Sequence, residues 1–152
     1  MRPPPGRFLH PGATRRRHTG GFEAIGLSTG QHALLAHIRS RSRHGVGCYG
    51  IEVAALAQLV EPELGRPAGG VDLVVVDEVG KMELLCPQVV EVVPRLLDGP
   101  VLVVAPVAMR GGRLIAEAKA RSDVRVVEVT AGNRGGLPGE LDKWVRAWLP
   151  ST

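Results

Sequence analysis

Long apolar runs alternate with helical patterns over the second half of the chain. Three runs consist largely of Val and Leu, which is typical of strands buried on both faces of a parallel sheet: residues 71–76, 101–104 and 124–129. Pro87 suits the first turn of a helix, and the apolar residues after it repeat at helical spacing. The same spacing returns in residues 114–120 and 137–149. This alternation of strands and helices predicts an α/β domain.

The first half of the chain has a different pattern. Residues 21–27 and 46–53 are short strand-like segments, which predict two hairpin-like neighbours, and residues 54–64 have helical spacing. Residues 31–45 end in an arginine-rich stretch and predict an exposed loop. Residues 1–20 are rich in Pro, Gly and Arg, so we expect a disordered basic tail there. The folded domain is therefore predicted to span residues 21–149.

The charge is distributed unevenly along the chain, so the net charge does not describe the folded part. The formal net charge is +4, but residues 1–20 contain five arginines and no acidic residue. The remaining residues contain 14 basic and 15 acidic side chains, a net charge of −1. Aromatic residues make up only 3% of the chain, so few side chains are available to stack on bases. Nucleic acid is therefore an unlikely partner of the folded part.

Cysteine and histidine positions give no metal site. Cys48 and Cys86 lack metal-ligand spacing; a disulfide between them is the alternative, and we expect two buried thiols in a reducing compartment. None of the five histidines is spaced for metal binding with Cys or a carboxylate. No apolar run approaches the roughly 20 residues of a membrane span, and no secretory signal pattern is present. These features predict a cytoplasmic protein without a membrane partner.

The candidate chemistry follows the run at residues 71–76, where Asp77 and Glu78 come directly after the predicted strand. Open α/β sheets bind ligands at the carboxyl ends of their strands. Mg²⁺ commonly takes one or two carboxylates together with phosphate oxygens, so Asp77 is the candidate metal ligand. Glu78 points to the other side of the strand and could orient or deprotonate an attacking water. A strand that simply ends in solvated acids is the alternative.

The longer segment Asp77-Glu78-Val79-Gly80-Lys81-Met82-Glu83-Leu84 resembles the Walker B segment of one P-loop group. That group is the nucleoside-triphosphatase family of thermophilic bacteria and archaea, which includes a vertebrate cancer-related member. The segment at residues 123–134 resembles the last core strand of the family and its Val-Thr-x-x-Asn-Arg signature. Weaker matches lie at residues 21–30 and 46–49, in the same order as in the family.

The resemblance implies a P-loop NTPase fold of the RecA/AAA-like kind, with a mostly parallel sheet flanked by helices. It implies slow, Mg²⁺-dependent hydrolysis of ATP, GTP and other nucleoside triphosphates to the diphosphate. Asp77 would then bind Mg²⁺ and Glu78 would act as the general base. Asn133 and Arg134 could line the nucleotide site, although a turn-stabilising Asn and a solvated Arg are equally compatible. Lys81 could pair with Glu83 or contact phosphate.

The chain departs from the family pattern in one important respect. A P-loop (Walker A) requires Gly-x-x-x-x-Gly-Lys-Ser/Thr, because its backbone N–H groups surround the phosphates. None of the three lysines, Lys81, Lys119 and Lys143, has that context. In the family the P-loop, its strand and its helix precede the region matched by residues 21–30, so we expect an incomplete N-terminal part. Two functions remain open: an impaired nucleoside-triphosphatase, or an inactive homologue that acts as a binding or regulatory protein.

Overall fold

The computed structural model describes residues 7–10, 20–26, 28–65 and 71–149. Its centre is one sheet of seven strands, which follow one another in space in the order β4 (Gly45–Val46), β5 (Tyr49–Ile51), β3 (His32–His37), β2 (Gly21–Gly26), β1 (Arg7–His10), β6 (Leu73–Val76) and β7 (Leu102–Val104). Strands β1, β6 and β7 are parallel to one another. The other four strands pair antiparallel, as does β1 with β2. The α/β class is therefore confirmed, with a parallel and an antiparallel half.

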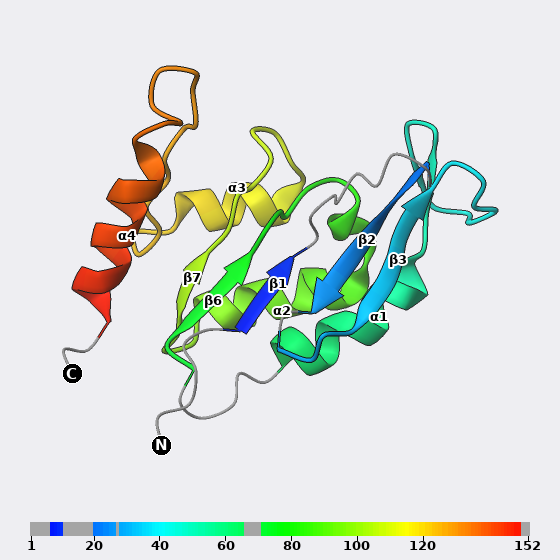
Figure 1. The fold of residues 1–152 in the computed structure, drawn as a ribbon, viewed down its shortest axis with the longest axis horizontal. Coiled ribbons are helices and arrows are strands. Elements are labelled where there is room, and N and C mark those ends of the chain that lie inside the picture. The colour runs from blue at the N-terminus through cyan, green and yellow to red at the C-terminus, as the bar shows by residue number, and fades with distance from the viewer. Residues whose placement is uncertain (1–6, 11–19, 27, 66–70, 150–152) are drawn as a thin grey trace.

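Two helices cover one face of the sheet, α1 (Val53–Val60) and α2 (Pro87–Leu97), as Figure 1 shows. Both helices were predicted from their apolar spacing, and α1 continues into a π-helical turn at Glu61–Gly65. Their apolar sides pack on the inward-facing side chains of the sheet. The largest fully buried apolar side chains come from these elements and from the turn: Ile51, Leu56, Leu59, Val60, Leu64, Val74 and Val92.

Three expectations for the first half of the chain are wrong. Residues 7–10 form β1 between β2 and β6, where we expected a disordered tail. The rest of that tail, residues 1–6 and 11–19, lies outside the described residues. Residues 32–37 form β3 instead of a loop, with Leu35 and Ala36 buried. The predicted strand at residues 46–53 is two strands, β4 and β5, because Gly47 adopts a left-handed φ of 61° and reverses the chain.

The last third of the chain contains the two predicted helices, α3 (Arg113–Ala120) and α4 (Leu137–Trp148). The predicted strand at residues 124–129 is wrong, because those residues pair with no described strand. Val126 is 54% exposed and Val129 is 64% exposed. Figure 1 shows α4 beyond β7, on the side away from β6. A strand needs a paired neighbour as well as a suitable sequence, and this segment has no such neighbour in the part of the chain that the structure describes.

Two further findings concern cysteine and membranes. Cys86 is buried as expected, but Cys48 is exposed because it lies in the turn between β4 and β5, and both thiols are free. In the part of the chain that the structure describes, no helix combines the length and the apolar character needed to span a bilayer.

Candidate functional site

The two predicted site carboxylates lie where β6 ends. Asp77 is half-buried and Glu78 is exposed, whereas Val79 immediately after them is buried. The Val79 N–H donates to the carbonyl oxygen of Pro106 at 2.9 Å, and Val79 pairs with Val107 in a parallel bridge. This bridge extends the pairing of β6 with β7 beyond the acids. The backbone on both sides of Asp77 and Glu78 is therefore fixed by the sheet.

A buried third acid, Glu83, closes the turn that follows. Its carboxylate accepts a hydrogen bond from the Gly80 N–H at 2.9 Å. Burial raises the pKa of Glu83; hydrogen bonds from the backbone oppose this, and the nearby charges of Glu78 and Asp77 raise the pKa further. A Cβ added to Gly80 would lie 2.5 Å from Glu78 Oε1 and 3.1 Å from Glu83 Oε2. The two glutamates therefore flank Gly80, and a side chain at position 80 would require the exposed Glu78 carboxylate to move aside.

Lys81 does not form the ion pair that the sequence allowed. It is exposed, and the Glu83 carboxylate instead accepts from the Gly80 backbone. None of the ion pairs found among the described residues includes Lys81. Lys81 thus remains available to a ligand that approaches the turn after β6.

Asn133 and Arg134 lie in the turns between residue 130 and α4. The Asn133 Oδ1 accepts from the Thr130 N–H at 2.8 Å, and its Nδ2 donates to the Glu128 carbonyl at 2.7 Å. The Asn133 side chain therefore stabilises the turn, which is one of the two roles considered for it. Arg134 is exposed. No hydrogen bond or ion pair given by the structure joins either residue to Asp77 or Glu78.

The described residues contain no group of three or more His, Cys, Asp or Glu side chains arranged to hold a metal ion. Mg²⁺ does not require such a group, because it keeps several waters and takes its remaining ligands from substrate phosphates. One half-buried aspartate at the end of a central strand fits that donor set.

Sequence reasoning missed a second buried acid, Glu63, which is only 1% exposed. It accepts from the Ser28 N–H at 3.2 Å, the Ser28 hydroxyl at 2.8 Å and the Thr29 N–H at 2.9 Å. Burial alone would raise the pKa of Glu63, but these hydrogen bonds together outweigh burial and lower the pKa. Glu63 thus attaches the loop after β2 to the turn that ends α1. Nothing in the spacing of residues 61–65 distinguishes this acid from a solvated one.

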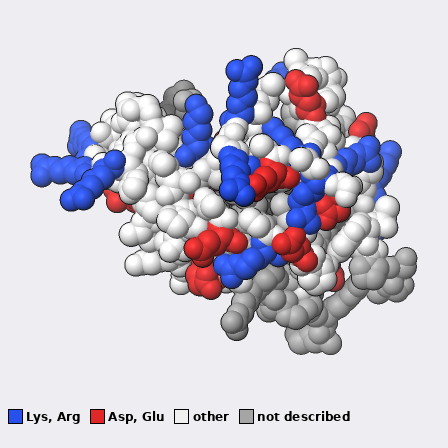
Figure 2. Space-filling view, turned by 180° about the vertical axis from the view of Figure 1, so that it is seen from behind, with Lys and Arg blue, Asp and Glu red and all other residues white. Residues whose placement is uncertain are grey.

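The surface shows mixed charge. Figure 2 presents the side of the molecule that is turned away in Figure 1, and there Lys and Arg side chains alternate with Asp and Glu. Among the described residues of this face, the basic side chains form no continuous surface of the kind that follows a nucleic acid backbone.

Comparison with known proteins shows to which class of protein this chain belongs. The family described as NTPase matches residues 8–141, and the chain belongs to that family. It is 33% identical to the nucleoside-triphosphatase THEP1 of Thermotoga maritima over 80% of this chain and 69% of the relative. It is 34% identical to the cancer-related nucleoside-triphosphatase homolog of Bos taurus, over 80% of this chain and 70% of the relative.

Solved structures agree with this assignment. The crystal structure of THEP1 from Aquifex aeolicus matches with a TM-score of 0.77 and 25% identity, covering 92% of this chain and 82% of that one. The solution structure of a human cancer-related nucleoside triphosphatase matches with a TM-score of 0.72 and 26% identity, covering 95% and 82%. The P-loop NTPase fold expected from the resemblance is therefore confirmed.

Proposed function

We propose that this chain provides the metal-binding and water-activating half of a nucleoside-triphosphatase site. Asp77 binds Mg²⁺, directly or through water, and Glu78 orients or deprotonates the attacking water. The observation that carries this proposal is the placement of both acids at the carboxyl end of β6, in a chain that belongs to the NTPase family. The substrates would be ATP, GTP and related nucleoside triphosphates.

The geometry supports a division of labour between the two acids. Half-burial and the Val79 bridge hold Asp77 at a defined depth at the end of the strand. Glu78 is exposed and free to move toward a bound water. Mg²⁺ would neutralise phosphate charge and hold the phosphate chain in line with that water. In this proposal the exposed Lys81 contacts the same phosphates.

Catalysis by these 152 residues alone is proposed to be weak. The sequence contains no Gly-x-x-x-x-Gly-Lys-Ser/Thr pattern, so the backbone N–H groups that would surround the phosphates are missing from it. Asp77 can bind the metal ion and Glu78 can act as the base, but these two acids cannot hold a highly charged anion by themselves. This same observation favours the second candidate, an inactive homologue that binds a partner or regulates one.

Phosphate release from ATP with Mg²⁺ tests the proposal, with wild type, Glu78→Gln and Glu91→Gln compared. Glu91 is an exposed glutamate of α2, so its variant controls for the loss of one surface charge. Release that Glu78→Gln lowers by at least about tenfold, about 1.4 kcal/mol in barrier height, and that Glu91→Gln leaves unchanged supports the enzyme. Equal background in all three supports the inactive homologue. Calorimetric titration showing micromolar affinity for ATP would contradict the proposed weakness.

A further inference from the structure

The loop between β3 and β4, residues 38–44, contains arginine and serine in alternation. Residues 39–43 read Arg-Ser-Arg-Ser-Arg, and their exposure alternates in the same way. Arg39, Arg41 and Arg43 are exposed, whereas the two serines between them are half-buried. We call this segment the arginine loop, because every second position of its central part presents a guanidinium to solvent.

The serines of the arginine loop hold its backbone in place. The Ser40 hydroxyl donates to Glu52 Oε1 at 2.5 Å and accepts from the Ser42 N–H at 3.0 Å. The Ser42 hydroxyl donates to the Ile51 carbonyl at 2.5 Å and accepts from the His44 N–H at 3.2 Å. Ile51 is a buried residue of β5, so these bonds connect the loop to the core. A group presented on a positioned backbone loses less entropy when it binds a partner.

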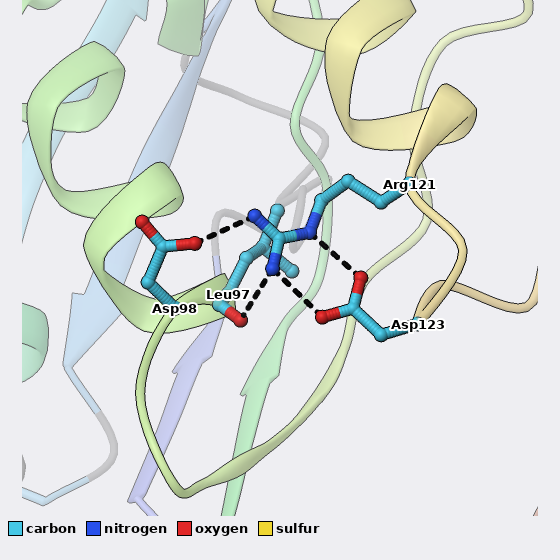
Figure 3. Close-up of polar contacts among 4 residues, drawn as sticks. All are labelled: Leu97, Asp98, Arg121 and Asp123. Atoms are coloured by element: carbon cyan, nitrogen blue, oxygen red, sulfur yellow. Dashed lines mark hydrogen bonds and ion pairs between the residues drawn. The ribbon is translucent and has the colours of Figure 1, made fainter.

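The three arginines of the loop differ from an arginine that stabilises this fold. Arg121 is such a residue, as Figure 3 shows: its guanidinium donates to Asp98 Oδ1 at 2.6 Å and to the Leu97 carbonyl at 3.1 Å. It also forms two hydrogen bonds with Asp123, at 2.8 and 2.7 Å. None of the ion pairs found among the described residues includes an arginine of the loop. Their planar donor groups are therefore available to an anionic partner.

The arginine loop lies at the same edge of the sheet as the candidate site. β1 runs parallel to β6, whereas β2 is antiparallel to β1 and β3 is antiparallel to β2, so β3 runs in the direction of β6. The carboxyl ends of β3 and β6 therefore share one edge, with β1 and β2 between them (Figure 1). Figure 2 shows Lys and Arg side chains gathered at the projecting end of the molecule formed by this loop, at the left of the view.

We propose that the arginine loop is a docking surface for an extended acidic segment of a partner protein. The segment has Asp or Glu at every second position, and each of the three arginines forms paired hydrogen bonds with one carboxylate. Alternate side chains of an extended peptide lie on one side, about 6.6 Å apart, so a row of acids can meet a row of arginines one by one. Ser40 and Ser42 keep the arginines in this order. Binding requires neither nucleotide nor Mg²⁺, so the inference does not rest on the proposed hydrolysis.

Three observations favour a protein segment over a nucleic acid. The basic stretch is short, and charge is mixed over the rest of the face in Figure 2, whereas nucleic acid binding uses a basic surface that follows the phosphates. Tyr49, the aromatic residue that follows the loop, is half-buried with its ring centre 5.0 Å from that of Phe22, so its ring is not presented to a base. Ile38, at the start of the loop, is 51% exposed and offers an apolar contact to a side chain of a protein.

The test measures binding of a fluorescein-labelled peptide, Leu-Gly-Glu-Thr-Glu-Thr-Glu-Thr, to the full chain by fluorescence polarisation at about 0.15 M NaCl. One control peptide has the same composition with its glutamates adjacent, and a second has Gln in place of each Glu. We expect the alternating peptide to bind at least about fivefold more tightly than the first control and about tenfold more tightly than the second. Amide exchange should show protection at residues 39–44. Equal binding of the alternating peptide and either control overturns the proposal.

Protein variants locate the binding. The loop variant combines Arg39→Gln, Arg41→Gln and Arg43→Gln, and should bind the alternating peptide at least about tenfold more weakly. A charge-matched control combines three exposed arginines elsewhere and should bind like wild type: Arg95→Gln, Arg110→Gln and Arg113→Gln. The five arginines of residues 1–20 are present in every variant, so they cannot account for a loss confined to the loop variant. Equal binding by the loop variant and wild type overturns the proposal.

Ser42→Ala tests whether the serines position the arginines. It leaves every charge in place and removes the bonds to the Ile51 carbonyl and the His44 N–H. We expect about threefold weaker peptide binding with an unchanged far-UV circular dichroism spectrum. Unchanged binding would mean that a loose row of charges suffices, which contradicts the positioned surface.

Two further measurements separate this surface from other sites. Glu78→Gln should bind the peptide like wild type, because the candidate site and the arginine loop are distinct; a loss of binding would contradict the proposed location. A single-stranded oligothymidine with the same number of negative charges should bind more weakly than the alternating peptide. Tighter binding of the oligothymidine that the loop variant abolishes would assign these arginines to a nucleic acid and overturn the proposal.

Discussion

Two regions of the chain contain similar valine-rich patterns but bury them to different extents. These regions are residues 20–104 and residues 121–149. The continuous cluster of buried apolar residues runs from Ala24 to Leu96 and includes the strand β6. After β7, only Ile115 and Leu137 are buried apolar residues within the described chain. Yet residues 71–76 and 124–129 have nearly the same valine-rich pattern. A valine-rich run is buried only where strands on both sides and helices on its face complete the environment.

This difference also bears on the site. Asp77 and Glu78 belong to the well-packed region, where β1 and β7 flank β6. Asn133 and Arg134 belong to the exposed region, where local hydrogen bonds stabilise the turn. The proposed metal and base positions are therefore fixed by the core, whereas residues that would approach the nucleotide from residues 121–149 depend on a region with little buried surface.

The largest effect is expected for Glu63→Ala, which breaks the attachment of the loop after β2. The variant leaves the Ser28 and Thr29 N–H groups without their acceptor and should lower the free energy of unfolding by about 3 kcal/mol. Urea denaturation followed by far-UV circular dichroism measures it. Glu61→Ala, an exposed acid of the same turn, should change stability by less than about 0.5 kcal/mol. Similar losses in both variants would mean that the Glu63 bonds contribute little.

A pair of identical substitutions compares the two valine-rich runs directly. Val74→Ala in β6, where the side chain is 1% exposed, should cost about 2.5 kcal/mol through lost burial and a cavity. Val126→Ala should cost less than about 0.5 kcal/mol, because that residue is already 54% exposed. Denaturant midpoints of both variants measure these two changes in stability. A comparable loss for Val126→Ala would show that residues 124–129 are packed in solution and would remove the contrast between the regions.

Arg121→Ala should loosen residues 121–149 while leaving the core intact. The substitution removes the hydrogen bonds to Leu97, Asp98 and Asp123 that tie this region to α2. Limited proteolysis should then cut between α3 and α4 faster than in wild type, with the circular dichroism melting transition unchanged. Arg113→Ala, which removes only a pair within α3, serves as the control. A lowered melting transition for Arg121→Ala would mean that the two regions unfold together.

The smallest effects are two pH dependences of opposite sign. The pKa of Glu63 is lowered in the folded chain, so its stabilising contribution is complete above the ordinary pKa of 4.5 and is lost as the pH falls through its folded pKa. The pKa of Glu83 is raised, so its ionisation lowers stability as the pH rises above 4.5 through its folded pKa. Glu63→Gln should flatten the acid side of the stability curve, and Glu83→Gln should remove the loss on the neutral side. Unfolding free energies measured from pH 3 to pH 7 distinguish them.

Elements with one dominant pattern were predictable from the sequence. Strand β6 and helix α2 have continuous or helically spaced apolar residues, and both formed as expected. Strand β3 was missed because Leu34 faces outward between residues that are less exposed, and the arginines after it suggested a loop. Strand β1 was missed because its pairing comes from β2 and β6, and the Pro- and Arg-rich sequence around it gives no local signal.

The candidate site was likewise predictable only where a position depends on one element. The sequence placed Asp77 and Glu78 at a strand end because that position depends on β6 alone. The roles of Glu63 and Asn133 depend on contacts with segments that local spacing does not specify. Glu63 lies 35 residues from Ser28 in the chain, and no local pattern shows that they meet.

The position of the tryptophans has a practical consequence. The chain has two, Trp144 and Trp148, and both lie on α4. Intrinsic tryptophan fluorescence therefore monitors detachment of this one helix and is blind to the melting of the sheet. The single tyrosine, Tyr49, has its ring 5.0 Å from that of Phe22 and is the native optical probe of the core. Emission from the two kinds of chromophore, recorded during one denaturation, would show whether the molecule unfolds in one transition or two.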